Sequence, residues 1–315
     1  MRGKKGSAYD GGHRVPFIIH WPDGKLTEKK SIKILTGFVD IVPTLLDLTG
    51  SENIPASLKF DGTSIKELLY KGDSIAWPAR YLITDSQRVR DPIKWRGSSV
   101  MSQKWRLING KELYDITADP GQKNNIAAAH PEQVQAMRQF YEDWWAELEP
   151  TFSQTTEIHL GHPKAPVVTL TGHDWIQERL PPWNQGHVRN DPATKDGKHQ
   201  GHWAVKVIET GTYNLEMRRW PKEADTAITA GLPVESNVPG ASKAFSTKPG
   251  KAFPFTSAVM RLNGKDIASK NIPEWATQVT FTAELTEGSH QLAPVFTTAD
   301  GKEVGAYYLI VSKAE

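Results

Sequence analysis

Apolar residues in the first part of the chain recur at helical spacings and predict two short helices. In "TGFVDIVPTLLDLTG" a broad apolar face is formed by Ile41, Val42, Leu45, Leu46 and Leu48. Asp40 suits the N-cap, Pro43 is tolerated in a first turn and Gly50 is a natural stop, so the segment predicts a helix. A second short helix is expected in "FDGTSIKELLYKGD", ending near Gly72.

Other apolar runs in this half are short and predict strands. The run "VPFIIHW", bounded by Pro16 and Pro22, suits a buried strand. Further strands are expected in "ARYLITDS" and in "GSSVMSQKWRLINGKELYDI", where Asn109-Gly110 is a strong hairpin signal. These strands predict a small antiparallel sheet.

A long amphipathic helix is predicted from about Pro131 to Leu148. Apolar side chains recur there at steps of three and four residues, at Val134, Met137, Tyr141, Trp144, Trp145 and Leu148. Such a stripe must be buried against another element, and the small sheet that precedes it is the expected partner.

The pattern of apolar and polar residues changes in the second half of the chain. From Trp203 onward, short alternating runs are separated by turn signals such as Asn263-Gly264, which is typical of an antiparallel β-sandwich. The predicted fold class is α+β: residues 1–150 form a small antiparallel sheet with packed helices, and residues 203–315 form a β-sandwich-like domain. Residues 151–202, rich in Pro, Gly and His, are expected to be an irregular connector.

The composition excludes several kinds of site and classes of protein, but it does not identify a function. The 315 residues contain no Cys, which excludes disulfides, thiolate metal sites and a cysteine nucleophile within them. A net charge of +2 gives no support for broad binding to nucleic acid. The longest apolar runs fall far short of the roughly 20 residues of a membrane-spanning helix, and no signal peptide is visible.

Four motifs together resemble one enzyme family. In order, they are "KKGSAYDGGHRVPFIIHWP", "FVDIVPTLLDLTG", "FDGTSI" and "KWRLINGKELYDITADPGQKNNIA". They closely resemble the C-terminal half of sulfatases of the arylsulfatase type, over residues 2–148. The remainder is similar, with less specific motifs, to the β-rich extension of some bacterial sulfatases.

The resemblance implies that the opening loop follows a large α/β domain that is mostly missing from this chain. In the family, that domain carries a formylglycine nucleophile made from Cys or Ser, and the carboxylate and amide ligands of a Ca²⁺ ion. Neither a Cys nor a Ser-x-Pro-x-Arg pattern occurs in the sequence. We therefore expect the chain to lack both the nucleophile and the Ca²⁺ ligands and to be inactive alone.

Lys5 is the catalytic candidate. It occupies the position of the lysine that contacts sulfate in the family, where an ammonium group can stabilise charge on a sulfate oxygen. Lys4 is expected to be an ordinary solvated charge. Arg14 is expected to pair with a carboxylate that shapes the loop, and the alternative is that it is a substrate-binding residue. Gly11 and Gly12 are expected to permit close approaches of the backbone.

Two further groups of residues are candidates for substrate binding. Gln87 and Arg88 could reach an anionic sugar sulfate, unless they belong to a solvated surface loop. His173 and Trp183 lie in a connector rich in stacking and hydrogen-bonding groups, although a Trp there can equally anchor the connector. The histidines of the connector show no compact ligand spacing, so zinc is disfavoured and no metal ligand is assigned.

The sequence leaves alternative functions open. The first hypothesis is a portion of a sulfatase that hydrolyses sulfate monoesters, with a sulfated small molecule or glycan as substrate and the missing half as partner. The second is a non-catalytic β-rich module that binds glycans or packs against a partner. A related phosphodiesterase or phosphonate hydrolase is a weaker option. The family resemblance implies a periplasmic or secreted location, with no nucleic-acid partner.

Overall fold

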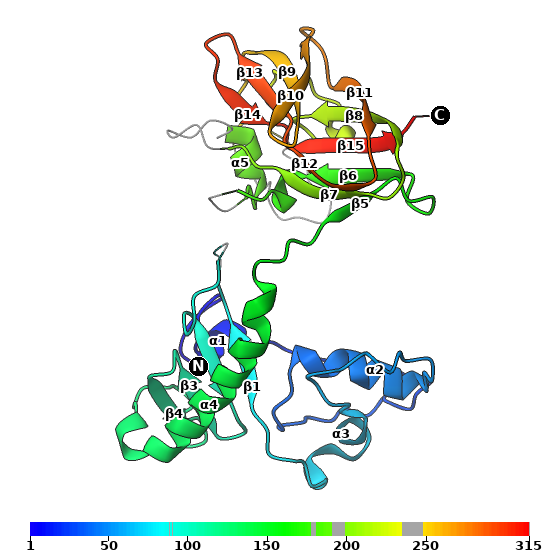
Figure 1. Ribbon diagram of the computed structural model, residues 1–315. Helices are drawn as coiled ribbons and strands as arrows, with labels where there is room; N and C mark the ends of the chain where they lie inside the picture. The colour runs from blue at the N-terminus through cyan, green and yellow to red at the C-terminus, as the bar shows by residue number, and fades with distance from the viewer. Residues whose placement is uncertain (88, 90, 178–180, 191–198, 235–247, 315) are drawn as a thin grey trace. The chain divides into compact units, whose positions relative to one another are not determined.

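The computed structural model describes residues 1–314 except 88, 90, 178–180, 191–198 and 235–247. The chain divides into two compact units, Met1–Phe152 and Ser153–Glu315, here called unit 1 and unit 2. Within the described ranges, unit 1 combines helices with one sheet and unit 2 is mostly strands (Figure 1). The α+β class is therefore confirmed.

Unit 1 contains an antiparallel sheet of four strands among its described residues. Its order is β1-β2-β3-β4, with bounds Leu82–Asp85, Ser98–Met101, Trp105–Ile108 and Glu112–Asp115. Between β3 and β4, Asn109 and Gly110 have φ values of 50° and 66°. The Lys111 amide donates to the Ile108 carbonyl at 2.9 Å. The hairpin predicted at Asn109-Gly110 is confirmed, and both residues have the positive φ that this turn requires.

Helix α4, Pro131–Leu148, packs against one face of this sheet (Figure 1). Its buried side chains are Met137, Tyr141 and Trp145. They share a hydrophobic cluster with the buried sheet residues Val100, Leu107 and Leu113. The predicted helix and its apolar stripe are confirmed, and the helix follows a 3₁₀ turn, η3, at Ala127–Ala129.

The remaining helices of unit 1 are short. Their bounds are Asp10–His13 for α1, Ile41–Thr49 for α2 and Lys66–Lys71 for α3, with 3₁₀ turns η1 at Phe38–Asp40, η2 at Gly72–Ser74 and η4 at Glu149–Thr151. Gly50 ends α2 with φ 62°, as its sequence predicted. Asp40 precedes α2 but does not cap it. Its buried carboxylate instead pairs with Arg80 at 2.6 Å.

The strand predicted for "VPFIIHW" does not form. Residues 15–20 are irregular, and only an isolated bridge joins Trp21 to Leu26. Val15, Phe17 and Ile18 are exposed, Ile18 to 85%. A strand needs a neighbour to take its backbone hydrogen bonds, and no strand within the described residues pairs with this segment.

Unit 2 contains two sheets within the residues that the structure describes. The larger has the order β14-β13-β9-β12-β7-β5, with β10 paired to β9. Its strands are β5 Ile158–Leu160, β7 Trp203–Val207, β9 Phe255–Leu262, β10 Lys265–Asn271, β12 Gly288–Leu292, β13 Val295–Thr298 and β14 Glu303–Gly305. The smaller has the order β11-β8-β15-β6. Its strands are β6 Val167–Thr171, β8 Gly211–Arg218, β11 Val279–Leu285 and β15 Tyr308–Lys313.

Both sheets of unit 2 contribute to one hydrophobic core. Buried Trp203 and Phe255 from the larger sheet join buried Leu215, Phe281 and Leu309 from the smaller one in a single cluster. The strand pairs are antiparallel except for β5 with β7. Helical segments of unit 2 are the short α5, Gln185–Asn190, and the 3₁₀ turns η5, Gly172–Asp174, and η6, Lys222–Ala224.

The segment expected to be an irregular connector differs from that expectation. Within residues 151–202, β5 pairs with β7 and β6 pairs with β15. Leu160 of β5 and Leu170 of β6 are fully buried in the core of unit 2. The segment is therefore part of the β-rich unit, because its short apolar runs complete both of that unit's sheets.

Candidate functional site

The loop that carries Lys5 lies on the face of the unit 1 sheet opposite α4. Leu107 and Leu113 point toward α4, so their neighbours Arg106, Ile108 and Tyr114 point the other way. On that second face, Ala8 packs with Ile108 and Tyr114 in a small buried cluster. The loop is thereby fixed to the two strands β3 and β4.

A buried ion pair forms the centre of this attachment. The Arg106 Nε donates to Asp10 Oδ1 at 2.8 Å, and His13 Nε2 lies 3.5 Å from the same oxygen. Burial alone would raise the pKa of Asp10, but the interactions with His13 and Arg106 outweigh it and hold that pKa below its ordinary value. Asp10 is therefore an ionised anchor for the loop.

A second set of contacts fixes the loop beside this pair. Tyr9 and Tyr114 both donate their hydroxyls to Glu112 Oε2, at 2.8 Å and 2.5 Å. Arg2 donates to the Tyr114 hydroxyl at 3.1 Å and lies over the Tyr9 ring, 3.8 Å from its centre. Burial and the hydrogen bond to Glu112 raise the pKa of Tyr114 to about 12, so its hydroxyl remains a donor.

The glycines of the motif allow the chain to fold back on itself. A Cβ at Gly12 would lie 2.0 Å from the Ser7 carbonyl oxygen, and one at Gly11 would lie 2.5 Å from that of Gly3. Both are closer than any side chain tolerates, which agrees with the expected role of these glycines. The fully buried Gln122 accepts the Asp10 amide at 2.9 Å and ties the loop to the turn after β4.

Lys5 itself projects from this fixed loop. It lies in the turn closed by the Ser7 amide donating to the Lys4 carbonyl at 2.9 Å, and its side chain is exposed. Neither Lys4 nor Lys5 forms a hydrogen bond or an ion pair with the residues that the structure describes. Geometry within this chain therefore does not distinguish the two lysines.

Arg14 does not take the role of loop anchor. Its side chain is exposed, and its backbone amide closes α1 on the Asp10 carbonyl at 2.9 Å. The carboxylate that shapes the loop, Asp10, is paired instead with Arg106. Arg14 stays a prediction as a substrate contact.

Gln87 is engaged within its own loop. Its amide group donates to Asp85 Oδ1 at 2.8 Å and to the Ile93 carbonyl at 2.9 Å, and its oxygen accepts the Ile93 amide at 2.7 Å. These bonds hold the ends of the loop together. Arg88 lies outside the described residues.

His173 and Trp183 belong to unit 2 and lie in adjacent segments there. His173 is exposed in η5, and Trp183, two residues before α5, is 56% exposed. A Cβ at Gly172 would lie 3.2 Å from Pro182 Cγ, so the two segments are in contact.

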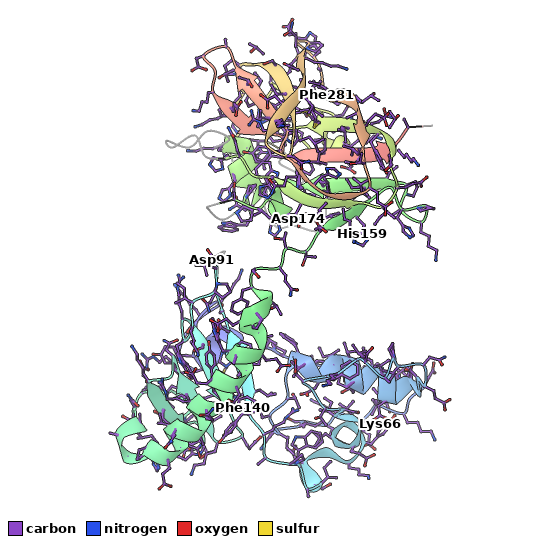
Figure 2. All side chains as sticks on the ribbon, viewed as in Figure 1. Lys66, Asp91, Phe140, His159, Asp174 and Phe281 are labelled. Atoms are coloured by element: carbon purple, nitrogen blue, oxygen red, sulfur yellow. The ribbon has the colours of Figure 1, made fainter. Side chains whose placement is uncertain are left out.

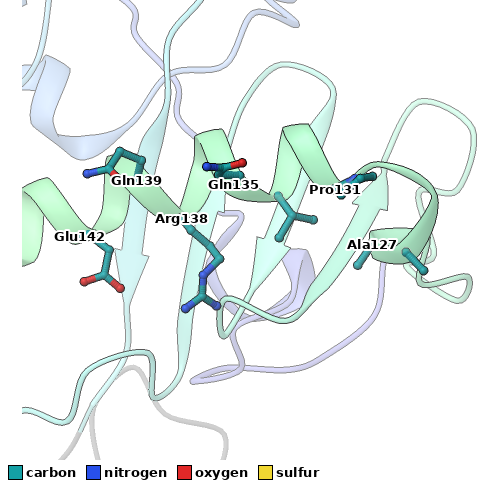
Figure 3. A pocket seen from close by; sticks show the side chains of 8 residues that line it. Ala127, Pro131, Gln135, Arg138, Gln139 and Glu142 are labelled. Atoms are coloured by element: carbon teal, nitrogen blue, oxygen red, sulfur yellow. The ribbon is translucent and has the colours of Figure 1, made fainter.

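A shallow depression of about 520 Å³ lies along α4 (Figure 3). It is lined by Ala127, Ala128, Pro131, Val134, Gln135, Arg138, Gln139 and Glu142. None of the sequence-predicted site residues lines it, and its polar side chains come from one exposed helix flank.

The described residues do not fit the Ca²⁺ ion that the resemblance implies. Among them, no group of three or more His, Asp or Glu side chains is placed to hold a metal ion. The two buried carboxylates of unit 1, Asp10 and Asp40, are already neutralised by Arg106 and Arg80. No helix in the described part of the chain has the length and apolar character needed to cross a membrane.

Comparison with known proteins places unit 1 in a family. Residues 4–147 match the family described as "N-sulphoglucosamine sulphohydrolase, C-terminal". An arylsulfatase of Hemicentrotus pulcherrimus is 40% identical over 74 residues, covering 24% of this chain and 13% of that protein. An N-acetylgalactosamine-6-O-sulfatase of Bacteroides thetaiotaomicron is 27% identical over 160 residues, covering 45% of this chain and 29% of that protein.

A mouse steryl-sulfatase is 24% identical over 192 residues, covering 51% of this chain and 30% of that protein. The chain thus spans less than a third of the length of these relatives. Among solved structures, a family 35 carbohydrate binding module from Clostridium thermocellum is 18% identical, with a TM-score of 0.25, and covers 48% of this chain and 100% of that one. The family match and the sulfatase relatives agree with the motifs of the opening loop, and residues 4–147 are similar to the C-terminal portion of sulfatases.

Proposed function

We propose that this chain is the C-terminal portion of a sulfatase that hydrolyses sulfate monoesters, and that Lys5 contacts the sulfate group. The observation that carries the proposal is the anchored loop. Asp10, Tyr9 and Arg2 fix its base to β3 and β4, while Lys5 stays exposed at its turn. A loop held in this way fixes the backbone position from which the Lys5 side chain extends, and contacts in the completed site would orient its ammonium group.

The chemistry of sulfate-ester cleavage suits such a group. Breaking the S–O bond leaves negative charge on the leaving oxygen, and the non-bridging oxygens are already charged. A positioned lysine stabilises this charge without having to reorganise during the reaction. The nucleophile and the metal ligands are expected in an α/β portion of the enzyme, so Lys5 would act at the rim of a site completed by that portion.

An exposed apolar surface supports a partner of that kind. The exposed apolar side chains lie in two segments of unit 1, with Val15, Phe17 and Ile18 in the first and Phe38, Val39, Val42 and Leu45 around the start of α2 in the second. Large exposed apolar areas on soluble proteins mark surfaces that are buried by another element. We infer that this surface, which includes segment 15–21, packs against the α/β portion.

The experiment joins the two portions. The α/β portion of the Bacteroides thetaiotaomicron relative is fused to residues 1–315, and turnover of 4-nitrophenyl sulfate is measured with added Ca²⁺. We expect turnover by the fusion and none by the 315-residue chain alone, because an ammonium group without a nucleophile has no reaction to accelerate. A fusion that melts cooperatively but is inactive, or turnover by the rigorously purified chain alone, would contradict the proposal.

The site defines the substrate only as an ester with a sulfate group. The ester must carry a sulfate group that is accessible to the loop, and a sulfated glycan or an aryl sulfate meets this requirement. A periplasmic or secreted location is part of the proposal.

A further inference from the structure

Unit 2 has an exposed aromatic side chain on a rigid base, and the segment that contacts this base carries exposed polar groups. Trp183 is 56% exposed, yet both residues beside it are fixed. Pro182, which precedes it, is buried. Asn184, which follows it, accepts the Gly186 amide on its side-chain oxygen at 2.8 Å and the His187 amide on its carbonyl oxygen at 3.1 Å. Trp183 is therefore held at the start of α5.

The ring of Trp183 is oriented as well as exposed. The imidazole of His187 meets it edge to face, with centres 5.4 Å apart and planes at 83°. The Tyr307 hydroxyl lies 3.5 Å from the His187 carbonyl oxygen, which fixes this turn of α5 to the core. An aromatic ring that is already oriented loses little conformational entropy when a ligand covers it.

Two polar side chains come from a second segment beside it. The Gly172 amide donates to the Tyr307 carbonyl at 2.6 Å, and Gly172 is in contact with Pro182. His173 and Asp174 follow Gly172, and Trp183 follows Pro182. All three side chains are exposed. Asp174 accepts the Thr171 hydroxyl at 3.0 Å on one oxygen and is at the surface of unit 2 (Figure 2).

We propose that Trp183, His173 and Asp174 form a binding site for an uncharged pyranose sugar. The indole face would cover the C–H face of the ring, while the carboxylate and the imidazole take hydrogen bonds with its hydroxyl groups. Ligand sites typically combine an apolar surface with a few fixed polar groups in this way. The Asp174 carboxylate repels anions, which favours a neutral sugar over a sulfated one.

This site lies in unit 2 and does not depend on sulfate hydrolysis. Its assignment is independent of the proposed sulfatase function, since binding is measured without turnover. The chain also provides a matched control. Trp275, in the turn before β11, is 78% exposed. It has no ring contact or hydrogen bond through its side chain among the described residues, so it lacks both the fixed orientation and the polar neighbours of Trp183.

The test is titration calorimetry of the full 315-residue chain with cellohexaose, mannohexaose, xylohexaose, neoagarohexaose and a κ-carrageenan hexasaccharide. We expect at least one neutral hexasaccharide to bind, Trp183→Ala to weaken it at least tenfold, and Trp275→Ala to leave it unchanged. Asp174→Asn should weaken binding of the same sugar by a smaller factor, and all variants should melt like the parent chain.

Three results would overturn the assignment. They are the absence of binding to every neutral hexasaccharide, equal binding by the parent chain and Trp183→Ala, and binding confined to the sulfated hexasaccharide. The last result would show that charge, and not the face of a neutral ring, is recognised.

Discussion

The ion pair of Asp10 and Arg106 determines how the motif loop is held, and its contribution depends on pH. Removing one member leaves the other buried without a partner, which costs about 3–5 kcal/mol. We expect Asp10→Asn to lower the free energy of unfolding of unit 1 by an amount of this order at pH 7. Asp61→Asn, at an exposed position, is the control and should change it little.

The pH dependence has a defined sign. The pKa of Asp10 is lowered in the folded chain, because the partners Arg106 and His13 outweigh the effect of burial. Stabilisation by its carboxylate is therefore complete above the unfolded-state pKa of about 3.9 and is lost as the pH falls through the lower folded-state value. Thermal melts from pH 7 down to pH 2 should show the parent and Asp10→Asn converging in acid. A constant difference across that range would contradict this account.

Lys5 and Lys4 differ in function if the proposed role is right, although they do not differ in their contacts here. In the active fusion, Lys5→Ala should lower turnover by roughly 100- to 1,000-fold, because one donor aimed at developing charge contributes about 2.7–4 kcal/mol. Lys4→Ala should lower it only slightly. Steady-state kinetics and melting curves of both variants decide the matter, and equal small losses would mean that Lys5 is an ordinary surface charge.

At the scale of elements, α4 is held to the sheet by polar contacts as well as by its apolar stripe. The Tyr141 hydroxyl donates to Asp85 Oδ2 at 2.8 Å and accepts the Trp95 amide at 3.1 Å. Trp95 also stacks on Tyr141, with ring centres 3.8 Å apart. Burial raises the pKa of Tyr141 above its ordinary value, so the hydroxyl keeps its proton and both bonds persist at neutral pH.

Removing this hydroxyl should loosen the loop between β1 and β2. Tyr141→Phe leaves the Trp95 amide without its acceptor, which costs about 1–3 kcal/mol of unfolding free energy. Gln139→Ala, on the exposed flank of the same helix, should cost less than about 0.5 kcal/mol. Urea denaturation followed by circular dichroism provides both values, and equal midpoints for the two variants would show that the hydroxyl contributes nothing.

Elements with strong local signals were predictable from the sequence. The stripe of α4, the stop at Gly50 and the Asn109-Gly110 turn each depend on residues that are close together in the chain. The strand predicted for segment 15–21 was wrong. An apolar run indicates that a segment tends to be buried, but it does not identify the element against which the segment packs. Strands β5 and β6 were missed since they are short and lie among Pro, Gly and His residues, although "VVTLT" in β6 carried a β-branched signal.

The candidate site was predictable only in part, for a similar reason. The motif pointed to the loop and to Lys5, whose role stays a prediction, and it suggested the close approaches at Gly11 and Gly12. The anchoring pair was missed because its two members, Asp10 and Arg106, are separated by 96 positions. No spacing rule connects such positions, although a charged residue inside the strand "KWRLI" was a signal that a buried carboxylate had to meet it.

At the scale of the whole molecule, the exposed apolar surface of unit 1 should govern behaviour in solution. Ile18 is 85% exposed and Phe38 is 73% exposed. We expect the chain to self-associate with increasing concentration, and the double variant Ile18→Lys with Phe38→Lys to remain monomeric at concentrations where the parent does not. Light scattering coupled to size-exclusion chromatography measures this.

The control for this prediction is a lone exposed Trp. Trp275→Lys in unit 2 should leave self-association unchanged, since a single exposed aromatic residue is common on monomeric proteins. In the active fusion, the same double variant should weaken or abolish turnover if the surface packs against the α/β portion. A fully active double variant would place that contact elsewhere.

The strand order of the smaller sheet in unit 2 has a consequence for biosynthesis. Strand β15, Tyr308–Lys313, lies between β6 and β8 and pairs with both. Strand β6 leaves the ribosome long before β15, so it cannot enter its sheet until Tyr308–Lys313 has been translated. This long-range closure gives unit 2 a high contact order, which slows folding. Unit 1, whose sheet and α4 adjoin in sequence, can fold while unit 2 is still being synthesised.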